Sequence, residues 1–125
     1  FAKEGLIVLE AKLQLQKGNR SEIEAYMKDL AARRREKQPL EYPSAGSTFK
    51  RPEGFFAGKL IMDAGLRGYS VGDACVSEKH CGFVINKGTA TAEDVCTLMK
   101  NVSAKIKDTF GVTLEPEVRI IGREL

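Results

Sequence analysis

The stretch PLEYPSAGSTFKRP, residues 39–52, separates two parts of the chain that differ in sequence pattern. It is rich in proline, glycine and serine, and it shows the period of neither a helix nor a strand. Structureless connections of this length are usually either functional or disordered, and the aromatic side chains Tyr42 and Phe49 argue against disorder. We therefore expect an ordered loop with a functional role.

The part before this loop has two regular patterns. Apolar and polar residues alternate over Leu9–Leu15, which predicts a long strand with one buried face. Asn19 follows as a helix N-cap, with Glu22 three residues on in the capping-box position. Apolar residues then recur at helical spacing over 23–31, which predicts a helix that ends before Pro39.

The part after the loop contains shorter patterns of both kinds. We predict a helix over 55–64 closed by Gly65, strands over 74–76 and 82–86, a helix opened by Thr91 with Asp94 and ended by Gly111, and a last strand over 112–123 that Pro116 interrupts. Together these elements predict an α+β fold. We expect residues 1–38 to complete one domain and residues 39–125 to form a second.

The composition is that of an ordinary globular protein, with 42% hydrophobic and 30% charged residues among 125 and a net charge of +3. No apolar run approaches the length of a membrane span, and the N-terminus does not resemble a signal peptide. Because the first residue is Phe1 rather than Met, we expect the chain to be a piece of a longer protein. Because no secretion signal is evident, we expect that protein to be cytoplasmic. The arginine run 33–35 has no interleaved aromatics, so we expect no nucleic-acid partner.

Cys75, Cys81 and Cys96 form no CxxC pair, and reduced cytosolic thiols are the expected reading. A metal site built from Cys75, His80 and Cys81 would lack both a known zinc spacing and an evident fourth ligand. We therefore expect no metal.

Ser47 and Glu117 are the candidates for chemistry. Ser47 follows a glycine in the loop, but His80 is the single histidine and there is no GxSxG elbow, so a nucleophilic serine is not supported. A proton-donating hydroxyl and a turn-forming hydroxyl both remain open. Glu117 lies beside Pro116, and either a catalytic carboxylate or a surface ion pair with Arg119 would fit.

Basic residues in or beside the loops could bind an anion. Lys37, Lys50, Arg51 and Arg67 could converge on a diphosphate, which arginine grips through parallel hydrogen bonds, or they could be solvated surface charges. The residues alone thus indicate an α+β domain with an anion-binding loop.

Four blocks of sequence resemble UDP-N-acetylenolpyruvoylglucosamine reductases, in the order and spacing of that family. They are residues 42–52, residues 57–61 with 65–68, residues 76–86, and residues 114–119. The resemblance implies the end of an FAD-binding domain over 1–38 and a C-terminal substrate-binding domain over 39–125, with a returning strand over 112–123. It also implies that NADPH reduces FAD, whose N5 then passes hydride to UDP-N-acetylglucosamine enolpyruvate and yields UDP-N-acetylmuramate for the cell wall.

The resemblance further implies residue roles. Ser47 matches the family's proton donor, and Glu117 matches the glutamate that stabilises the enol form together with an arginine. Lys37, Arg51, Arg67 and His80 match positions on or near those that face the substrate's nucleotide, although Arg51 and His80 each replace an amide of the longer branch. Arg119 is assigned to the phosphates of substrate or flavin.

The family's catalytic arginine and its flavin-binding loops belong to segments upstream of Phe1. The resemblance therefore implies a fragment that is inactive alone and that binds little FAD. A stand-alone module that binds a UDP-sugar or another anion remains the alternative. We also expect the chain to associate with itself through its first strand.

Overall fold

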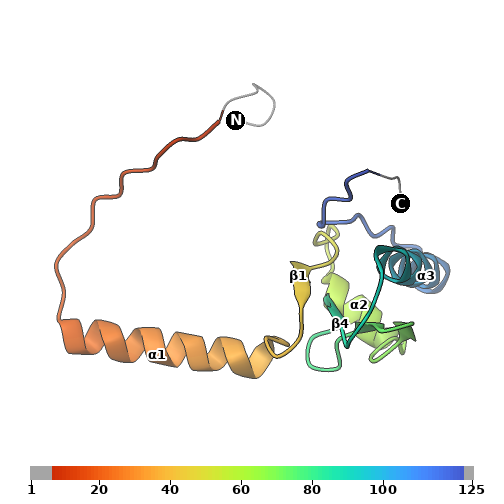
Figure 1. Ribbon diagram of the computed structural model, residues 1–125, viewed down its shortest axis with the longest axis horizontal. Coiled ribbons are helices and arrows are strands. Elements are labelled where there is room, and N and C mark those ends of the chain that lie inside the picture. The colour runs from red at the N-terminus through yellow and green to blue at the C-terminus, as the bar shows by residue number, and fades with distance from the viewer. Residues whose placement is uncertain (1–6, 123–125) are drawn as a thin grey trace. The chain divides into compact units, whose positions relative to one another are not determined.

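The helix with the clearest local signals, α3 (Ala92–Phe110), forms where the sequence predicts it. The structure, a computed structural model, describes residues 7–122 (Figure 1). Thr91 accepts a hydrogen bond from the Asp94 amide and donates its own amide to the Asp94 carboxylate, so both halves of the capping box are present. Gly111 ends the helix with φ 70°, a left-handed conformation that costs glycine little.

Four short strands form one antiparallel sheet in the order β1-β4-β3-β2. They are β1 (Ser44–Ser47), β2 (Ser70–Val71), β3 (Ala74–Val76) and β4 (Phe83–Asn86). The strands predicted over 74–76 and 82–86 are confirmed, while β2 was not predicted. The prediction of an irregular loop over 39–52 is wrong at its centre, because β1 pairs with the apolar strand β4 there.

Helix α3 packs against β2 and β3, and α2 (Ala57–Asp63) packs against α3. The second predicted helix is confirmed, although Phe55 and Phe56 precede it and are exposed. The core consists of apolar side chains from both helices, from β3 and from two flanking segments: Phe49, Leu60, Ile61, Ala74, Val76, Leu98, Met99, Val102, Ile106 and Leu114. Each buried valine, leucine, isoleucine, methionine or phenylalanine side chain stabilises the fold by about 1.5–3 kcal/mol. Phe110, at the end of α3, is exposed.

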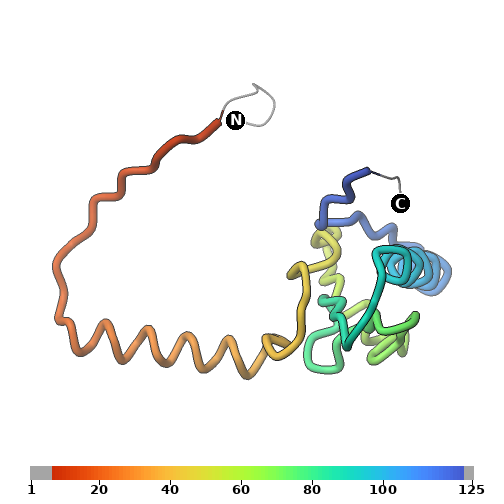
Figure 2. Tube along the Cα trace, in the orientation of Figure 1, coloured from red at the N-terminus to blue at the C-terminus, as the bar shows by residue number. Residues whose placement is uncertain are grey.

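The predicted last strand, 112–123, is wrong over the described residues, since 112–122 form only one isolated bridge, Phe49 to Pro116. Proline has no amide to donate, so the pairing cannot continue as a ladder. Hydrogen bonds on either side still hold the segment beside the end of β1, from the Lys50 amide to the Glu115 carbonyl and from the Glu117 amide to the Thr48 carbonyl. Figure 2 shows this blue segment beside the yellow end of β1.

Contacts divide the chain into two units, Phe1–Ala31 and Ala32–Leu125. In the first unit the strand predicted over Leu9–Leu15 is wrong, because residues 7–19 have no regular structure and Leu9 is 92% exposed. A strand needs a partner for its backbone groups, and the described residues of this unit contain no other strand. The predicted boundary between 1–38 and 39–125 stays a prediction.

The helix α1 (Arg20–Lys37) is confirmed, with Asn19 Oδ1 accepting hydrogen bonds from the amides of Ser21 and Glu22. Its apolar residues from Ile23 to Leu30 are exposed. None of the helices in the described part of the chain is long and apolar enough to span a membrane.

Candidate functional site

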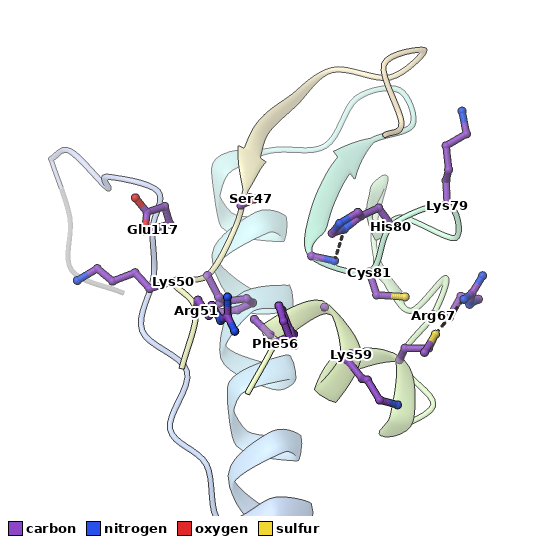
Figure 3. A pocket seen from close by; sticks show the side chains of 15 residues that line it. Ser47, Lys50, Arg51, Phe56, Lys59, Arg67, Lys79, His80, Cys81 and Glu117 are labelled. Carbon is purple, nitrogen blue, oxygen red and sulfur yellow. Dashed lines mark hydrogen bonds between the residues drawn. The ribbon is translucent and has the colours of Figure 1, made fainter. Parts of the chain in front are cut away.

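A cavity of about 670 Å³ lies within the second unit, where the last residue of β1 and the turn before β4 meet the start of α2 (Figure 3). Its lining combines hydroxyl, carboxylate, imidazole and cationic groups with a few apolar side chains: Ser47, Phe49, Lys50, Arg51, Phe56, Ala57, Gly58, Lys59, Met62, Arg67, Lys79, His80, Cys81, Gly82 and Glu117. Five lining side chains are cationic and one is a carboxylate. The cavity is therefore suited to an anionic ligand.

Ser47 is placed by a distortion of β1. Gly46 has φ 83°, and the pairing changes from Ser44–Ile85 to Ser47–Phe83, so β1 has one more residue than β4 in this interval. Such a bulge redirects the following side chain, and glycine accommodates it. Ser47 is exposed and lines the cavity.

Thr48 joins the segment of Ser47 to that of Glu117. Its amide donates to the Gly82 carbonyl at 2.9 Å, its carbonyl accepts from the Glu117 amide at 2.9 Å, and its hydroxyl accepts from the Val84 amide at 3.0 Å. Thr48 itself is buried. Because one buried residue fixes both neighbours, Ser47 and Glu117 line the same cavity although 70 positions separate them in the sequence.

The two glutamates beside Pro116 have different surroundings. Glu115 forms an ion pair with Lys50, Oε2 to Nζ at 3.1 Å. Glu117 lines the cavity instead. Within the described residues no ion pair joins Glu117 to Arg119, so the surface pair considered from sequence does not form.

The cavity's two arginines are held in place by groups that do not neutralise them. The guanidinium carbon of Arg51 lies 3.9 Å from the centroid of the Phe56 ring. Arg67 donates from Nη1 to the Glu78 carbonyl at 2.6 Å and from Nη2 to the Met62 sulfur at 3.1 Å. Among the described residues neither arginine pairs with a carboxylate. Both therefore keep their charge available to a ligand.

The cavity's lysines, in contrast, are paired with carboxylates. Lys50 binds Glu115, Lys59 binds Asp63 at 2.8 Å, and Lys79 binds Glu41 at 3.0 Å. A backbone hydrogen bond, and after it the hydrogen bond from Lys79, lowers the pKa of the Glu41 carboxyl. These exposed pairs contribute little to stability, and they reduce the charge that the lysines offer to a ligand.

His80 is oriented by its own turn. Its Nδ1 accepts a hydrogen bond from the Gly82 amide at 3.1 Å, and its ring meets Phe83 edge-on with centroids 5.0 Å apart. An acceptor at Nδ1 places the proton of the neutral ring on Nε2. A Cβ on Gly82 would lie 2.9 Å from the His80 ring, and one on Gly58 would lie 3.0 Å from the Gly82 amide. Glycine at Gly58 thus allows α2 to lie close to this turn, and glycine at Gly82 leaves room for the His80 ring.

Cys81 is the one thiol in the lining. It is 7% exposed, and burial raises its pKa, against a smaller opposing effect of Arg67. The group is therefore a neutral thiol at ordinary pH and a poor nucleophile or metal ligand. Across residues 7–122 no cluster of three or more His, Cys, Asp or Glu side chains could hold a metal ion.

Six of the eight residues singled out from sequence for chemistry or anion binding line the cavity: Ser47, Lys50, Arg51, Arg67, His80 and Glu117. Lys37, in the last turn of α1, and Arg119 do not line it. Sequence reasoning missed Lys59, Lys79, Phe56 and Met62. Lys59 and Lys79 both fall in the matched sequence blocks, which was the available signal, but nothing in their spacing separates them from ordinary surface lysines.

Comparison with known proteins gives one family. The family description "UDP-N-acetylenolpyruvoylglucosamine reductase, C-terminal domain" matches residues 38–121. The UDP-N-acetylenolpyruvoylglucosamine reductase of Agathobacter rectalis is 68% identical over 96% of this chain, and that of Lachnoclostridium phytofermentans is 64% identical over 98%. A crystal structure of the enzyme from Thermus caldophilus matches with a TM-score of 0.69 and 35% identity over 86% of the chain.

The chain spans only part of these proteins, 38% of the Agathobacter rectalis sequence, 40% of the Lachnoclostridium phytofermentans sequence and 38% of the Thermus caldophilus chain. The family match itself covers most of this chain and the whole cavity lining. The chain therefore belongs to the UDP-N-acetylenolpyruvoylglucosamine reductase family, and residues 38–121 are its C-terminal domain.

Proposed function

We propose that this chain supplies the substrate-binding and proton-donating part of a reductase that converts UDP-N-acetylglucosamine enolpyruvate to UDP-N-acetylmuramate, in peptidoglycan synthesis. The observation that carries the proposal is the cavity that Ser47 and Glu117 share with two uncompensated arginines. A hydroxyl, a carboxylate and a cationic wall are what protonation of an anionic substrate needs. The names of the related enzymes agree with this proposal.

In this proposal Arg51 and Arg67 bind the nucleotide part of the substrate, and Arg67 binds its diphosphate. Guanidinium groups suit phosphate oxygens because they donate parallel, charge-assisted hydrogen bonds. Arg67 uses one donor on each of two nitrogens to hold its place, which leaves further N–H groups for a ligand. His80 adds an Nε2–H donor to the same cavity, and Lys37 remains a proposed substrate residue that lies outside the lining.

Ser47 donates the proton and Glu117 stabilises the enol form. Addition of hydride beside a carboxylate creates an enolate, and the adjacent carbon then takes a proton from the serine hydroxyl. A serine hydroxyl is a weak acid, so it can act only when the enolate forms next to it in a pocket that excludes water. The bulge at Gly46 supports this role because it fixes the serine at the cavity's edge.

FAD, reduced by NADPH, supplies the hydride when it is bound. The described residues of this chain do not by themselves fit a flavin dinucleotide. Arg119, the residue proposed for the cofactor's phosphates, is exposed and lies outside the cavity. We therefore propose that FAD is held mainly by residues outside this chain. We also propose that residues 1–38 complete the FAD-binding domain.

Turnover tests this function. The full-length protein that carries this chain should consume NADPH when UDP-N-acetylglucosamine enolpyruvate is added, with UDP-N-acetylmuramate as the product by mass spectrometry. UDP-N-acetylglucosamine, which lacks the double bond, is the matched control and should give no turnover. If the protein binds the UDP-sugar but leaves the double bond intact, the alternative of a binding module without catalysis replaces the proposal.

A further inference from the structure

Phe56 is an exposed aromatic residue in a cavity lined mainly by charged groups. Its side chain is 59% exposed and forms part of the cavity wall. Its backbone is fixed, since the Phe56 carbonyl accepts hydrogen bonds from the amides of Lys59 and Leu60 at 3.0 and 3.1 Å as α2 begins. Leaving a phenylalanine ring in water forfeits the free energy of its burial, about 1.5–3 kcal/mol. The ring is thus anchored and accessible without contributing to the core.

Arg51 lies over this ring, with its guanidinium carbon 3.9 Å from the ring centroid (Figure 3). Both groups are planar, and both stack on flat aromatic ligands. The charge of Arg51 is not offset by a carboxylate among the described residues. The pair therefore offers a planar surface together with a positive charge.

The other aromatic groups near the cavity do not offer such a surface. Phe49 lines the cavity but is 4% exposed, and the His80 ring is in edge contact with Phe83. Phe55, the neighbour of Phe56, lines an adjacent cavity of about 370 Å³, which shares Lys50 and Arg51 with the first cavity but does not include Phe56. Phe56 is thus the phenylalanine that presents an open face to a ligand here.

We propose that the Arg51–Phe56 pair is a stacking platform for the planar base of the nucleotide substrate, and that Phe56 is a specificity-determining residue. This inference rests on the proposed function, because it assigns a place to one part of that substrate. A base is a flat heterocycle whose faces stack well on phenylalanine rings and guanidinium planes. Arg67 and the remaining donors are left to the diphosphate, so the platform selects ligands that carry both a base and an anion.

Calorimetry on the full-length protein tests the platform with two probes, UDP and inorganic pyrophosphate. Loss of one base stack predicts that Phe56→Ala and Phe56→Leu each weaken UDP binding by about tenfold or more, while Phe56→Tyr keeps it. Pyrophosphate has no base, so its affinity should be the same for the wild type and the three Phe56 variants. Phe55→Ala is the matched control, since it removes an exposed phenylalanine outside this cavity and should leave UDP binding unchanged.

The outcomes separate this inference from the function on which it rests. Unchanged UDP affinity in both Phe56→Ala and Phe56→Leu, in a protein that still reduces its substrate, overturns the platform alone. An equal loss for UDP and pyrophosphate also overturns it, because Phe56 would then only orient Arg51. If pyrophosphate binds too weakly to measure, failure of Phe56→Tyr to match the wild type overturns it. A wild-type protein that neither binds UDP nor turns over overturns the proposed function as well.

Discussion

Arg51 and Arg67 differ from the lysines of the same cavity in how they are held. Each lysine has a carboxylate partner, whereas the arginines rest on an aromatic ring, a backbone carbonyl and a thioether. Contacts of the second kind fix a guanidinium in space without cancelling its charge. Because each guanidinium is already held in place, a phosphate that binds it costs less side-chain entropy, which favours affinity.

This difference predicts the effect of removing Arg67. Arg67→Ala in the full-length protein should weaken UDP binding by roughly tenfold or more, since a charge-assisted hydrogen bond is worth about 1.5–3 kcal/mol. The loss should shrink as salt is raised. Lys105→Ala removes one exposed charge from α3, outside the cavity, and should change little. Calorimetry at two salt concentrations measures the UDP affinity of both variants. An equal loss of affinity in Arg67→Ala and Lys105→Ala would mean that only the net charge of the protein matters.

The candidate site could be predicted from sequence only where the resemblance singled out positions. Ser47 and Glu117 carry no signal of their own, because a serine after glycine and a glutamate beside proline are common on protein surfaces. Their placement in one cavity depends on the hydrogen bonds of Thr48. Phe56 falls within the helix predicted over 55–64, because local spacing does not reveal that this residue precedes the observed helix and stays exposed.

At the scale of elements, the N-terminal cap of α3 stabilises the helix through hydrogen bonds between Thr91 and Asp94. The pKa of Asp94 is lowered, first by the backbone hydrogen bond from Thr91 and then by the Thr91 hydroxyl. A lowered pKa means that the folded state resists protonation. Its stabilising contribution is therefore present above the carboxyl's ordinary pKa and is lost as pH falls through the lower folded value.

Thr91→Ala should accordingly reduce the stability of the domain by about 1 kcal/mol at neutral pH, the usual cost of a lost N-cap hydroxyl. Stability should also fall less steeply with acid below about pH 4, because one bond that favours ionised Asp94 is gone. Urea unfolding at neutral and acidic pH measures both effects. Thr109→Ala, at the exposed end of the same helix, is the control, and a matching loss there would exclude the cap as the cause.

Elements with local signals were predictable and elements that need distant partners were not. The helix α3 has its own cap, period and terminal glycine, so its bounds followed from sequence. The stretches Leu9–Leu15 and 112–122 have strand-like patterns, yet neither forms a strand, because strand formation depends on a neighbour's backbone. At β1 a strand forms where none was predicted. Its glycine and serine residues are typical of a loop, and it forms a strand because it pairs with β4.

For the molecule as a whole, the exposed apolar residues near the N-terminus lead to a prediction about association. Leu9, Leu13 and Leu15 are exposed, and each could gain roughly 1.5–3 kcal/mol by burial. We expect the 125-residue chain to associate with itself through this segment, and we expect the three Leu→Ser substitutions together to abolish association. The matched control is the triple substitution Lys12→Ser, Gln14→Ser and Gln16→Ser, which should leave association unchanged. Light scattering that shows a monodisperse monomer at high concentration would contradict the prediction.

The proposed chemistry needs the full-length protein, because in that proposal Ser47 acts on a substrate that has received hydride from a cofactor held by residues outside this chain. The two half-reactions of such an enzyme can be followed separately by stopped-flow absorbance of the flavin. A residue that only donates a proton to substrate should affect the second half-reaction alone. Ser44, which is exposed on β1 and does not line the cavity, offers the matched serine control.

Stopped-flow measurement of Ser47→Ala in the full-length protein is therefore the decisive experiment. We predict that NADPH reduces the flavin at the wild-type rate and that reoxidation by UDP-N-acetylglucosamine enolpyruvate slows by about 10²–10⁴-fold, the usual contribution of a placed proton donor. Ser44→Ala should match the wild type in both half-reactions. Equal loss in the two half-reactions of Ser47→Ala, or no loss in reoxidation, would contradict the role of Ser47 as the proton donor.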